Sequence, residues 1–205
     1  MTRYLRELRL VLTTLLSLAC ASPAFAQQDL IARMQSGGTV VFLRHAETDY
    51  SQIDTGRLDD RAGQRNLSEA GRAQARELGA AFEALDIEFA HVRTSPVYRA
   101  RDTAELAFGP DAIEVTMDLV ADDYAGGNLR DMIAATRGLL ATEPPEGENL
   151  LLVGHRTPLE MVTGDGFPDT ILPEGAMAVF APGGGVTRLL GTVSPDALIA
   201  AAEAR

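Results

Sequence analysis

The amino-acid sequence predicts a three-layer α/β/α sandwich with a mostly parallel central sheet, helices on both faces and a C-terminal β-hairpin. Two continuous apolar, β-rich runs, residues 39–43 and 150–153, are typical of buried central parallel strands. Strand and helix patterns alternate along the chain, which favours one sheet with helical crossovers. The length of 205 residues suffices for one α/β domain with a well-buried core.

The remaining elements follow from periodicity and from turn residues. Further strands are expected at residues 88–93 and 113–115, and a terminal hairpin at residues 176–181 and 186–193. Helices are expected at residues 29–35, from an N-cap at Ser68 to about Leu85, from Ser95-Pro96 to about Phe108, over 128–141, and for one to two turns after Pro158. Residues 46–66 form a polar loop without clear periodicity, and loops of this length inside a domain are usually functional or disordered.

The first 26 residues predict a secretory signal peptide. Three arginines precede an apolar run at residues 10–20, which is too short to span a bilayer. Residues 24–26 (AFA) fit the small-x-small pattern, so cleavage is expected before Gln27. The chain then divides into a signal peptide, 1–26, and a single domain, 27–205, that is periplasmic or secreted and not inserted in the membrane. An uncleaved anchor helix is the alternative.

The net charge restricts the possible partners, and the cysteine content indicates how the domain is stabilised. The formal net charge is −11, and removal of the net +2 of residues 1–26 leaves −13 on the predicted mature domain. This balance disfavours nucleic acid and anionic membrane surfaces as partners. Cys20 is the only cysteine, so the mature domain has no thiol and its stability depends on packing. No prediction follows for the oligomeric state.

Two of the three histidines occupy matching places in the predicted fold. His45 and His155 each follow one of the two buried strands, and each adjoins an arginine. In open α/β sheets, ligands bind beyond the carboxyl ends of the strands. A nucleophilic imidazole flanked by guanidinium groups suits attack on a phosphoryl group, whose transition state spreads negative charge over three oxygens. His91, inside a predicted strand, is interpreted as structural.

Four segments carry a resemblance to a known family. They are residues 43–48 (LRHAET), 65–75 (RNLSEAGRAQA), 94–104 (TSPVYRARDTA) and 153–156 (VGHR), in this order along the chain. Together they resemble the histidine phosphatase (phosphoglycerate mutase-like) superfamily over about residues 38–160. The resemblance implies that His45 is the nucleophile that accepts the phosphoryl group. It also implies that Arg44, Arg99 and His155 hold the non-bridging oxygens, with no metal and no cofactor.

The general acid departs from the family pattern. The family often uses a glutamate after the third strand, or an aspartate directly after the second histidine. Here Arg156 follows His155, and the position expected for the glutamate falls on Ala121. Asp122 and Asp123 are the candidates that remain. Some members of the superfamily work without such an acid on good leaving groups such as phosphohistidine or an acyl phosphate.

The loop at residues 51–66 is expected to decide substrate choice. Its arginines recur every four residues, which would place them on one face of a helix, where they would bind a second anionic group of the substrate. Pairing with Asp54, Asp59 and Asp60 of the same loop is the alternative. The candidate substrate-binding residues are Thr48, Arg57, Arg61, Arg65 and Arg156.

The resemblance implies an exported, metal-independent phosphatase of the histidine acid type. It would hydrolyse a phosphomonoester, such as a sugar phosphate or a similar small phosphorylated substrate, through a phosphohistidine intermediate on His45. A phosphoprotein phosphatase acting on phosphohistidine is the alternative within the enzymes. A non-catalytic phosphate- or polyanion-binding module with a retained pocket is the alternative outside them.

Overall fold

The predicted α/β sandwich with a mostly parallel sheet is confirmed. The computed structural model describes residues 23–183 and 186–205, so residues 1–22 of the predicted signal peptide and the glycines at 184–185 lie outside the described part. The strands are β1 (Val40–Arg44), β2 (Phe89–Thr94), β3 (Ile113–Val115), β4 (Asn149–Gly154), β5 (Met177–Gly183) and β6 (Val186–Val193). The helices are α1 (Pro23–Gln35), α2 (Glu69–Ala84), α3 (Tyr98–Phe108), α4 (Asp122–Ala125), α5 (Leu129–Leu140), α6 (Arg156–Thr163) and α7 (Pro195–Glu203).

The six strands form one sheet in the order β3-β2-β4-β1-β5-β6. The first four strands of this order run parallel, and the β5–β6 hairpin joins them antiparallel to β1. In the central pair, Arg44 at the end of β1 is in register with Gly154 at the end of β4. The residues after both strands therefore emerge together at one edge of the sheet.

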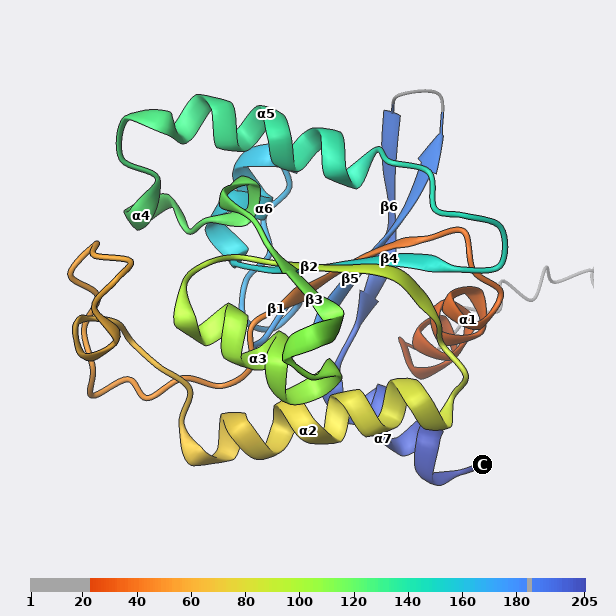
Figure 1. Ribbon diagram of the computed structural model, residues 1–205. Coiled ribbons are helices and arrows are strands. Elements are labelled where there is room, and N and C mark those ends of the chain that lie inside the picture. The colour runs from red at the N-terminus through yellow and green to blue at the C-terminus, as the bar shows by residue number, and fades with distance from the viewer. Residues whose placement is uncertain (1–22, 184–185) are drawn as a thin grey trace, which may run out of the picture.

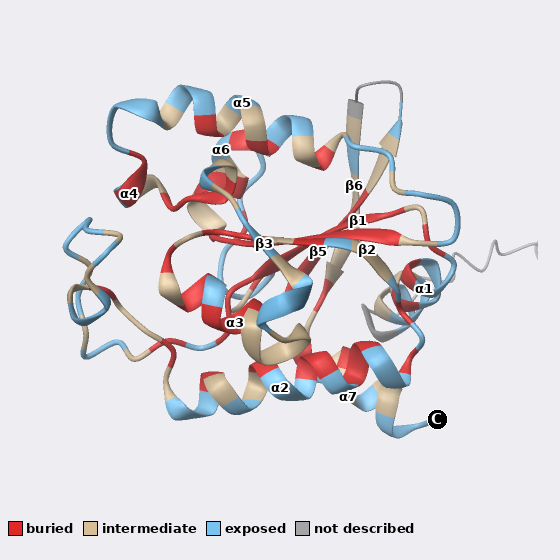
Figure 2. Cartoon of the chain, in the orientation of Figure 1, coloured by how far each residue is buried: buried red, intermediate tan, exposed pale blue. Residues whose placement is uncertain are grey.

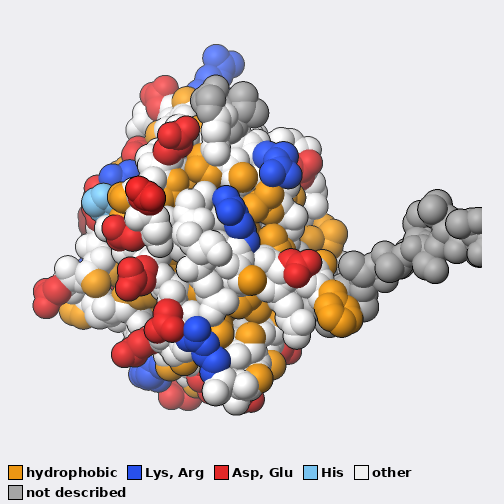
Figure 3. Space-filling model, turned by 90° about the vertical axis from the view of Figure 1, so that its right-hand side faces the viewer, with side chains coloured by type: hydrophobic (Ala, Val, Ile, Leu, Met, Phe, Trp, Pro, Cys, Tyr) orange, Lys and Arg blue, Asp and Glu red, His pale blue; other side chains and the backbone are white. Residues whose placement is uncertain are grey.

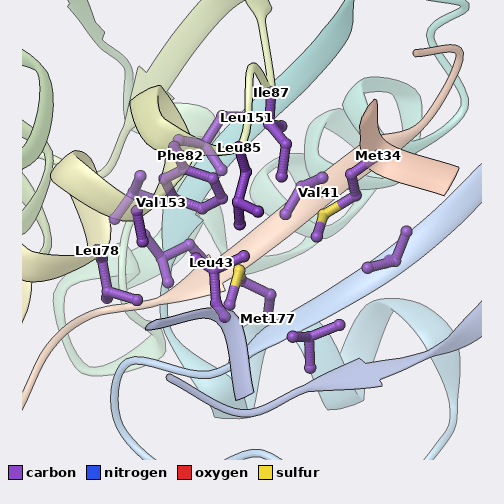
Figure 4. Close-up of a cluster of buried hydrophobic side chains, with 14 of the residues drawn as sticks. Met34, Val41, Leu43, Leu78, Phe82, Leu85, Ile87, Leu151, Val153 and Met177 are labelled. Atoms are coloured by element: carbon purple, nitrogen blue, oxygen red, sulfur yellow. The ribbon is translucent and has the colours of Figure 1, made fainter. Parts of the chain in front are cut away.

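Helices cover both faces of the sheet, with α5 and α6 on one face and α1, α2, α3 and α7 on the other (Figure 1). Side chains of β1 alternate between the two cores because successive residues of a strand point to opposite faces. Val41 and Leu43 join the core on the α2 side, whereas Phe42 joins the core under α5 and α6. Figure 4 shows the core on the α2 side of the sheet, in which Phe82 of α2 packs beside residues of β1 and β4.

Helix α2 is tied to the loop that follows β1. Ser68 caps the helix as predicted, because its side chain accepts a hydrogen bond from the Gly71 N–H. The Ser68 N–H donates to the Glu47 carbonyl at 3.1 Å, and a Cβ on Gly71 would lie 1.9 Å from the same oxygen. Glycine is therefore required where the helix meets the loop carrying His45.

Three helix starts differ from the sequence-based expectation. Helix α3 begins at Tyr98, not at Ser95-Pro96, because the Ser95 hydroxyl accepts from the Val97 N–H and holds a turn before the helix. Helix α6 begins two residues before Pro158, which is tolerated because N–H groups of the first turn need no intrahelical partner. Helix α1 begins earlier than residue 29, and helices α4 and α7 were not predicted.

The surface combines charged and apolar groups without a dominant patch in the view of Figure 3, where Arg and acidic side chains are interspersed with hydrophobic ones. Figure 2 shows the buried residues concentrated in the sheet and on the inward sides of the helices. Among the residues in the described ranges, no helix is long and apolar enough to cross a membrane.

Asn149, at the start of β4, joins four separate segments. Its Oδ1 accepts from the hydroxyl and the N–H of Thr39, at 2.6 and 3.2 Å. Its Nδ2 donates to the carbonyls of Met34 and Glu88, at 2.8 and 3.0 Å. The side chain is fully buried, so loss of the amide would leave several buried groups without partners.

We therefore expect Asn149→Ala to lower the free energy of unfolding by about 2–4 kcal/mol. The matched control is Asn128→Ala, because Asn128 is exposed before α5 and makes no side-chain capping bond there. Urea denaturation of both variants measures the difference. Equal destabilisation by the two substitutions would contradict the role assigned to the Asn149 network.

Candidate active site

The structure brings the two histidines together at the carboxyl edge of the sheet. The His45 N–H donates to the Gly154 carbonyl at 3.1 Å, which extends the β1–β4 pairing by one residue. The rings of His45 and His155 have centroids 5.4 Å apart and planes inclined at 54°. Both side chains are buried.

His45 has a defined tautomer. Its Nδ1 lies 2.9 Å from the Ala46 carbonyl oxygen, and a carbonyl can only accept, so Nδ1 carries the hydrogen. Nε2 therefore holds the free lone pair, as a nucleophile requires. Burial lowers the pKa of His45 well below 6.5, and the positive charges of Arg99, Arg44 and Arg65 lower it further. The ring is thus held neutral.

His155 is oriented by Ser95. Its Nε2 lies 2.8 Å from the Ser95 hydroxyl, which already accepts from the Val97 N–H. The hydroxyl can donate its hydrogen to Nε2, and in that arrangement the ring hydrogen lies on Nδ1, which has no partner in the described part of the chain. Burial and then the charge of Arg99 lower the pKa of His155 well below 6.5. Even as a neutral ring, His155 can donate one hydrogen bond from Nδ1.

A cavity of about 270 Å³ lies at this edge of the sheet. Asp54 and Thr157 line it together with most of the predicted site residues. The predicted residues in its lining are Arg44, His45, Arg65, Arg99, Asp122, Asp123, His155 and Arg156.

Residues of this cavity carry buried nitrogens without hydrogen-bond partners. In the described part of the chain, five buried side-chain atoms lack a partner, and four of them belong to cavity residues. These are Arg44 Nε, Arg65 Nε, Arg99 Nε and His155 Nδ1. A buried donor without a partner costs about 1–3 kcal/mol, so such a cluster indicates a site that binds an acceptor ligand.

Asp54 holds Arg99 and was not among the predicted site residues. Nη1 of Arg99 donates to both carboxylate oxygens of Asp54, at 3.1 and 3.2 Å. The Tyr124 hydroxyl and the Arg65 N–H donate to the same carboxylate, at 2.5 and 3.0 Å. Burial by itself raises the pKa of Asp54, but these hydrogen bonds and the Arg99 charge lower it overall. The loop after β1 is thereby joined to α3 and α4, which lie at the same end of the molecule (Figure 1).

Asp169, in the loop after α6, holds the two arginines that flank the histidines. Nη1 of Arg44 donates to Asp169 Oδ1 at 2.5 Å and to the Leu172 carbonyl at 2.7 Å. Nη1 of Arg156 donates to the same Asp169 oxygen at 2.8 Å. The hydrogen bond from Arg44 lowers the pKa of Asp169. The loop containing Asp169 carries no motif that would have revealed this role.

The expected helical arrangement of the loop arginines is wrong. The loop consists of turns with one 3₁₀ turn at Arg61–Gly63. Arg61 points away from the cavity, where it forms two hydrogen bonds with Asp102, at 2.5 and 2.9 Å, and stacks over the Tyr98 ring. Arg57 is exposed and lies outside the cavity lining, so only Arg65 of the three reaches the site.

Thr48 also lies outside the cavity lining, contrary to its predicted contact with substrate. It is buried, and both its N–H and its hydroxyl donate to the Glu174 carboxylate, at 3.1 and 2.8 Å. Glu174 was not found from the sequence, because it lies in a short turn before β5 without a recognisable motif.

Both acidic candidates for proton transfer line the cavity. Asp122, the first residue of α4, is half-buried, whereas Asp123 is exposed. Burial raises the pKa of Asp122, and the neighbouring charge of Asp123 raises it further. A raised pKa favours the protonated carboxyl group, which is the form that can donate a proton, and so favours Asp122 of the two.

Comparison with known proteins agrees with this geometry. Residues 40–137 match the family model described as histidine phosphatase superfamily, branch 1. This match assigns residues 40–137 to the histidine phosphatase superfamily. A sequence comparison with curated proteins gave no match.

Three solved structures share the fold at low sequence identity. The protein histidine phosphatase SixA, complexed with tungstate, has 19% identity and a TM-score of 0.53, covering 78% of this chain and 99% of that one. Mycobacterial glucosyl-3-phosphoglycerate phosphatase has 20% identity and a TM-score of 0.52, covering 77% and 100%. Phosphoserine phosphatase from Entamoeba histolytica, in complex with 3-phosphoglyceric acid, has 13% identity and a TM-score of 0.53, covering 78% and 98%.

The histidine environments give a testable prediction. In the ligand-free protein, the rings of His45 and His155 should stay neutral at pH 6.5 and protonate only at lower pH, because both pKa values are lowered. Both rings should carry their hydrogen on Nδ1, for the reasons given above. Side-chain ¹⁵N NMR titration measures pKa and tautomer together, with His45→Ala and His155→Ala for assignment. A ring that is already protonated at pH 7 would contradict this electrostatic description.

Proposed function

We propose that this protein is an exported, metal-independent phosphatase that hydrolyses a phosphomonoester through a phosphohistidine on His45. One observation carries the proposal: buried donors without protein partners belong to residues that line the same cavity as a neutral, oriented imidazole. A phosphoryl group supplies the acceptor oxygens that these donors lack. Membership of the histidine phosphatase superfamily supports the same chemistry.

In the first step, the Nε2 lone pair of His45 forms a bond to phosphorus as the bond to the leaving oxygen breaks. The broken bond's electron pair goes to the leaving oxygen, which takes a proton from Asp122. The guanidinium groups of Arg44 and Arg99 and the Nδ1–H of His155 bind the non-bridging oxygens. In the second step, water attacks phosphorus and gives its proton to Asp122, and Nε2 regains its electron pair.

The charges around the cavity favour substrates without a second anionic group. Beyond Arg44, Arg99 and His155, which would bind the phosphoryl oxygens, the lining carries the two carboxylates of Asp122 and Asp123 against the one guanidinium group of Arg65. Arg156 is paired with Asp169, and Arg61 is paired with Asp102 away from the site. A neutral leaving group, such as the sugar of a sugar phosphate, fits this charge pattern better than a carboxylate or a second phosphate does.

Export is proposed from the sequence pattern of residues 1–26, with a periplasmic or secreted location. Cleavage before Gln27 would remove only the start of α1. The Gln27 side chain accepts hydrogen bonds from the N–H and the hydroxyl of Ser194, at 2.8 and 3.1 Å, and so would still hold the shortened helix to the domain.

The first functional test is His45→Ala. We expect its turnover of p-nitrophenyl phosphate to fall at least about 10³-fold, because no other group in the cavity is placed as the nucleophile. Rapid quenching of the unsubstituted protein with a phosphorylated substrate should trap acid-labile phosphate on residue 45. The matched control is His91→Ala, since His91 is exposed and lies outside the cavity.

Assays run with and without EDTA should agree, because the proposed reaction needs no metal. Loss of activity in EDTA would refute metal independence. Phosphate binding without turnover would favour the non-catalytic binding module instead.

The proton-transfer role of Asp122 predicts a dependence on the leaving group. Asp122→Asn should cost on the order of 10²-fold in kcat/KM, which reports transfer of the phosphoryl group to His45, for an alkyl phosphate, but less than about threefold in kcat/KM for p-nitrophenyl phosphate, whose leaving group needs no proton. Asp123→Asn keeps the Asp122 carboxyl and should retain the leaving-group dependence of the unsubstituted protein. Equal losses on both substrates in Asp122→Asn would remove Asp122 from this role.

A further inference from the structure

Glu174 lies near Nδ1 of the proposed nucleophile and is not part of the cavity lining. It sits in the turn that precedes β5, and its side chain is only 9% exposed. Its Oε1 lies 3.9 Å from His45 Nδ1 and 3.8 Å from Arg44 Nη2. A negative charge at this distance affects the stability of any positive charge on the imidazole.

Hydrogen bonds hold this carboxylate in place. Both oxygens accept hydrogen bonds from Thr48, Oε2 from the N–H and Oε1 from the hydroxyl. The N–H of Gly175 donates to the His45 carbonyl at 2.9 Å, and Gln74 Nε2 donates to the Glu174 carbonyl at 3.3 Å. The turn is thus joined directly to the backbone of His45. Thr48 therefore contributes to the site by holding Glu174.

The charge on the imidazole changes during the proposed reaction. While Nδ1 keeps its hydrogen on the Ala46 carbonyl, bond formation from Nε2 to phosphorus leaves the ring of His45 with a formal positive charge. Hydrolysis of the phosphohistidine returns the electron pair to Nε2 and removes that charge. The nearby arginines oppose the positive ring, whereas a carboxylate beside Nδ1 favours it.

We propose that Glu174 is a positioning residue whose negative charge stabilises the cationic phosphohistidine on His45. This inference rests on the proposed function. The same carboxylate repels the phosphate dianion of the bound substrate. Glu174 therefore weakens binding of the substrate in the ground state and stabilises the transition state that leads to the intermediate. Removal of its charge should lower kcat and raise the affinity for phosphate.

The decisive variant is Glu174→Gln, which removes the charge but keeps the shape and can still accept from the Thr48 N–H. We expect kcat to fall on the order of 10- to 100-fold, the range of pKa effects from a charge at this distance. Inorganic phosphate should bind about two- to tenfold more tightly, as measured by competitive inhibition. Rapid quenching should trap a smaller fraction of phosphohistidine at steady state.

Glu47→Gln is the matched control. Glu47 belongs to the same loop as Thr48, but its carboxylate accepts from Ser68 and lies outside the cavity lining. This control should change kcat and phosphate affinity by less than about twofold. Glu174→Asp retains the charge on a shorter side chain, so it should bind phosphate as the unsubstituted protein does and lose less activity than Glu174→Gln.

The outcomes separate this inference from the proposed function. If the unsubstituted protein forms phosphohistidine on residue 45, but Glu174→Gln leaves kcat unchanged or weakens phosphate binding together with kcat, only the role of Glu174 is refuted. Equal losses in the Gln and Asp variants would assign the effect to geometry rather than charge and would also refute it. Unchanged turnover in His45→Ala would instead refute the proposed function.

Discussion

The site depends on the parallel pairing of β1 with β4. Arg44 and Gly154 are in register, and a histidine follows each of them. The register therefore brings the two imidazole rings together, with centroids 5.4 Å apart. Both strands are buried on both faces, so apolar packing from two cores determines their register. A shift by one residue would turn the hydrophobic side chains of β1 into the wrong cores and would separate the histidines.

The cations of the site are held by carboxylates. Asp54 binds Arg99, and Asp169 binds both Arg44 and Arg156. These pairs fix the guanidinium groups in place, which limits reorganisation when a phosphoryl group arrives. They also reduce the net positive charge, so the affinity for an anion depends on the nitrogens that remain unpaired.

Much of the fold could be predicted because its signals are local. Apolar runs identified the central strands, and Ser68 identified the start of α2 through its capping pattern. The start of α3 was placed too early, because Ser95 engages in a turn and in a contact with His155 instead of capping the helix. Helix α7 was missed even though Ser194 caps it, because its alanine-rich sequence has little amphipathic contrast.

The residues of the site likewise fall into those identified from the sequence and those found only in the structure. The positions of His45 and His155 followed from the two apolar strands that precede them, and the family resemblance implied the role of Arg99. Which charges face each other became known from tertiary contacts alone. Asp54 reaches Arg99 across 45 residues and Glu174 reaches Thr48 across 126, and such contacts depend on the paths of loops that have no periodicity of their own. For the same reason, Arg61 turned toward Asp102 instead of toward the cavity.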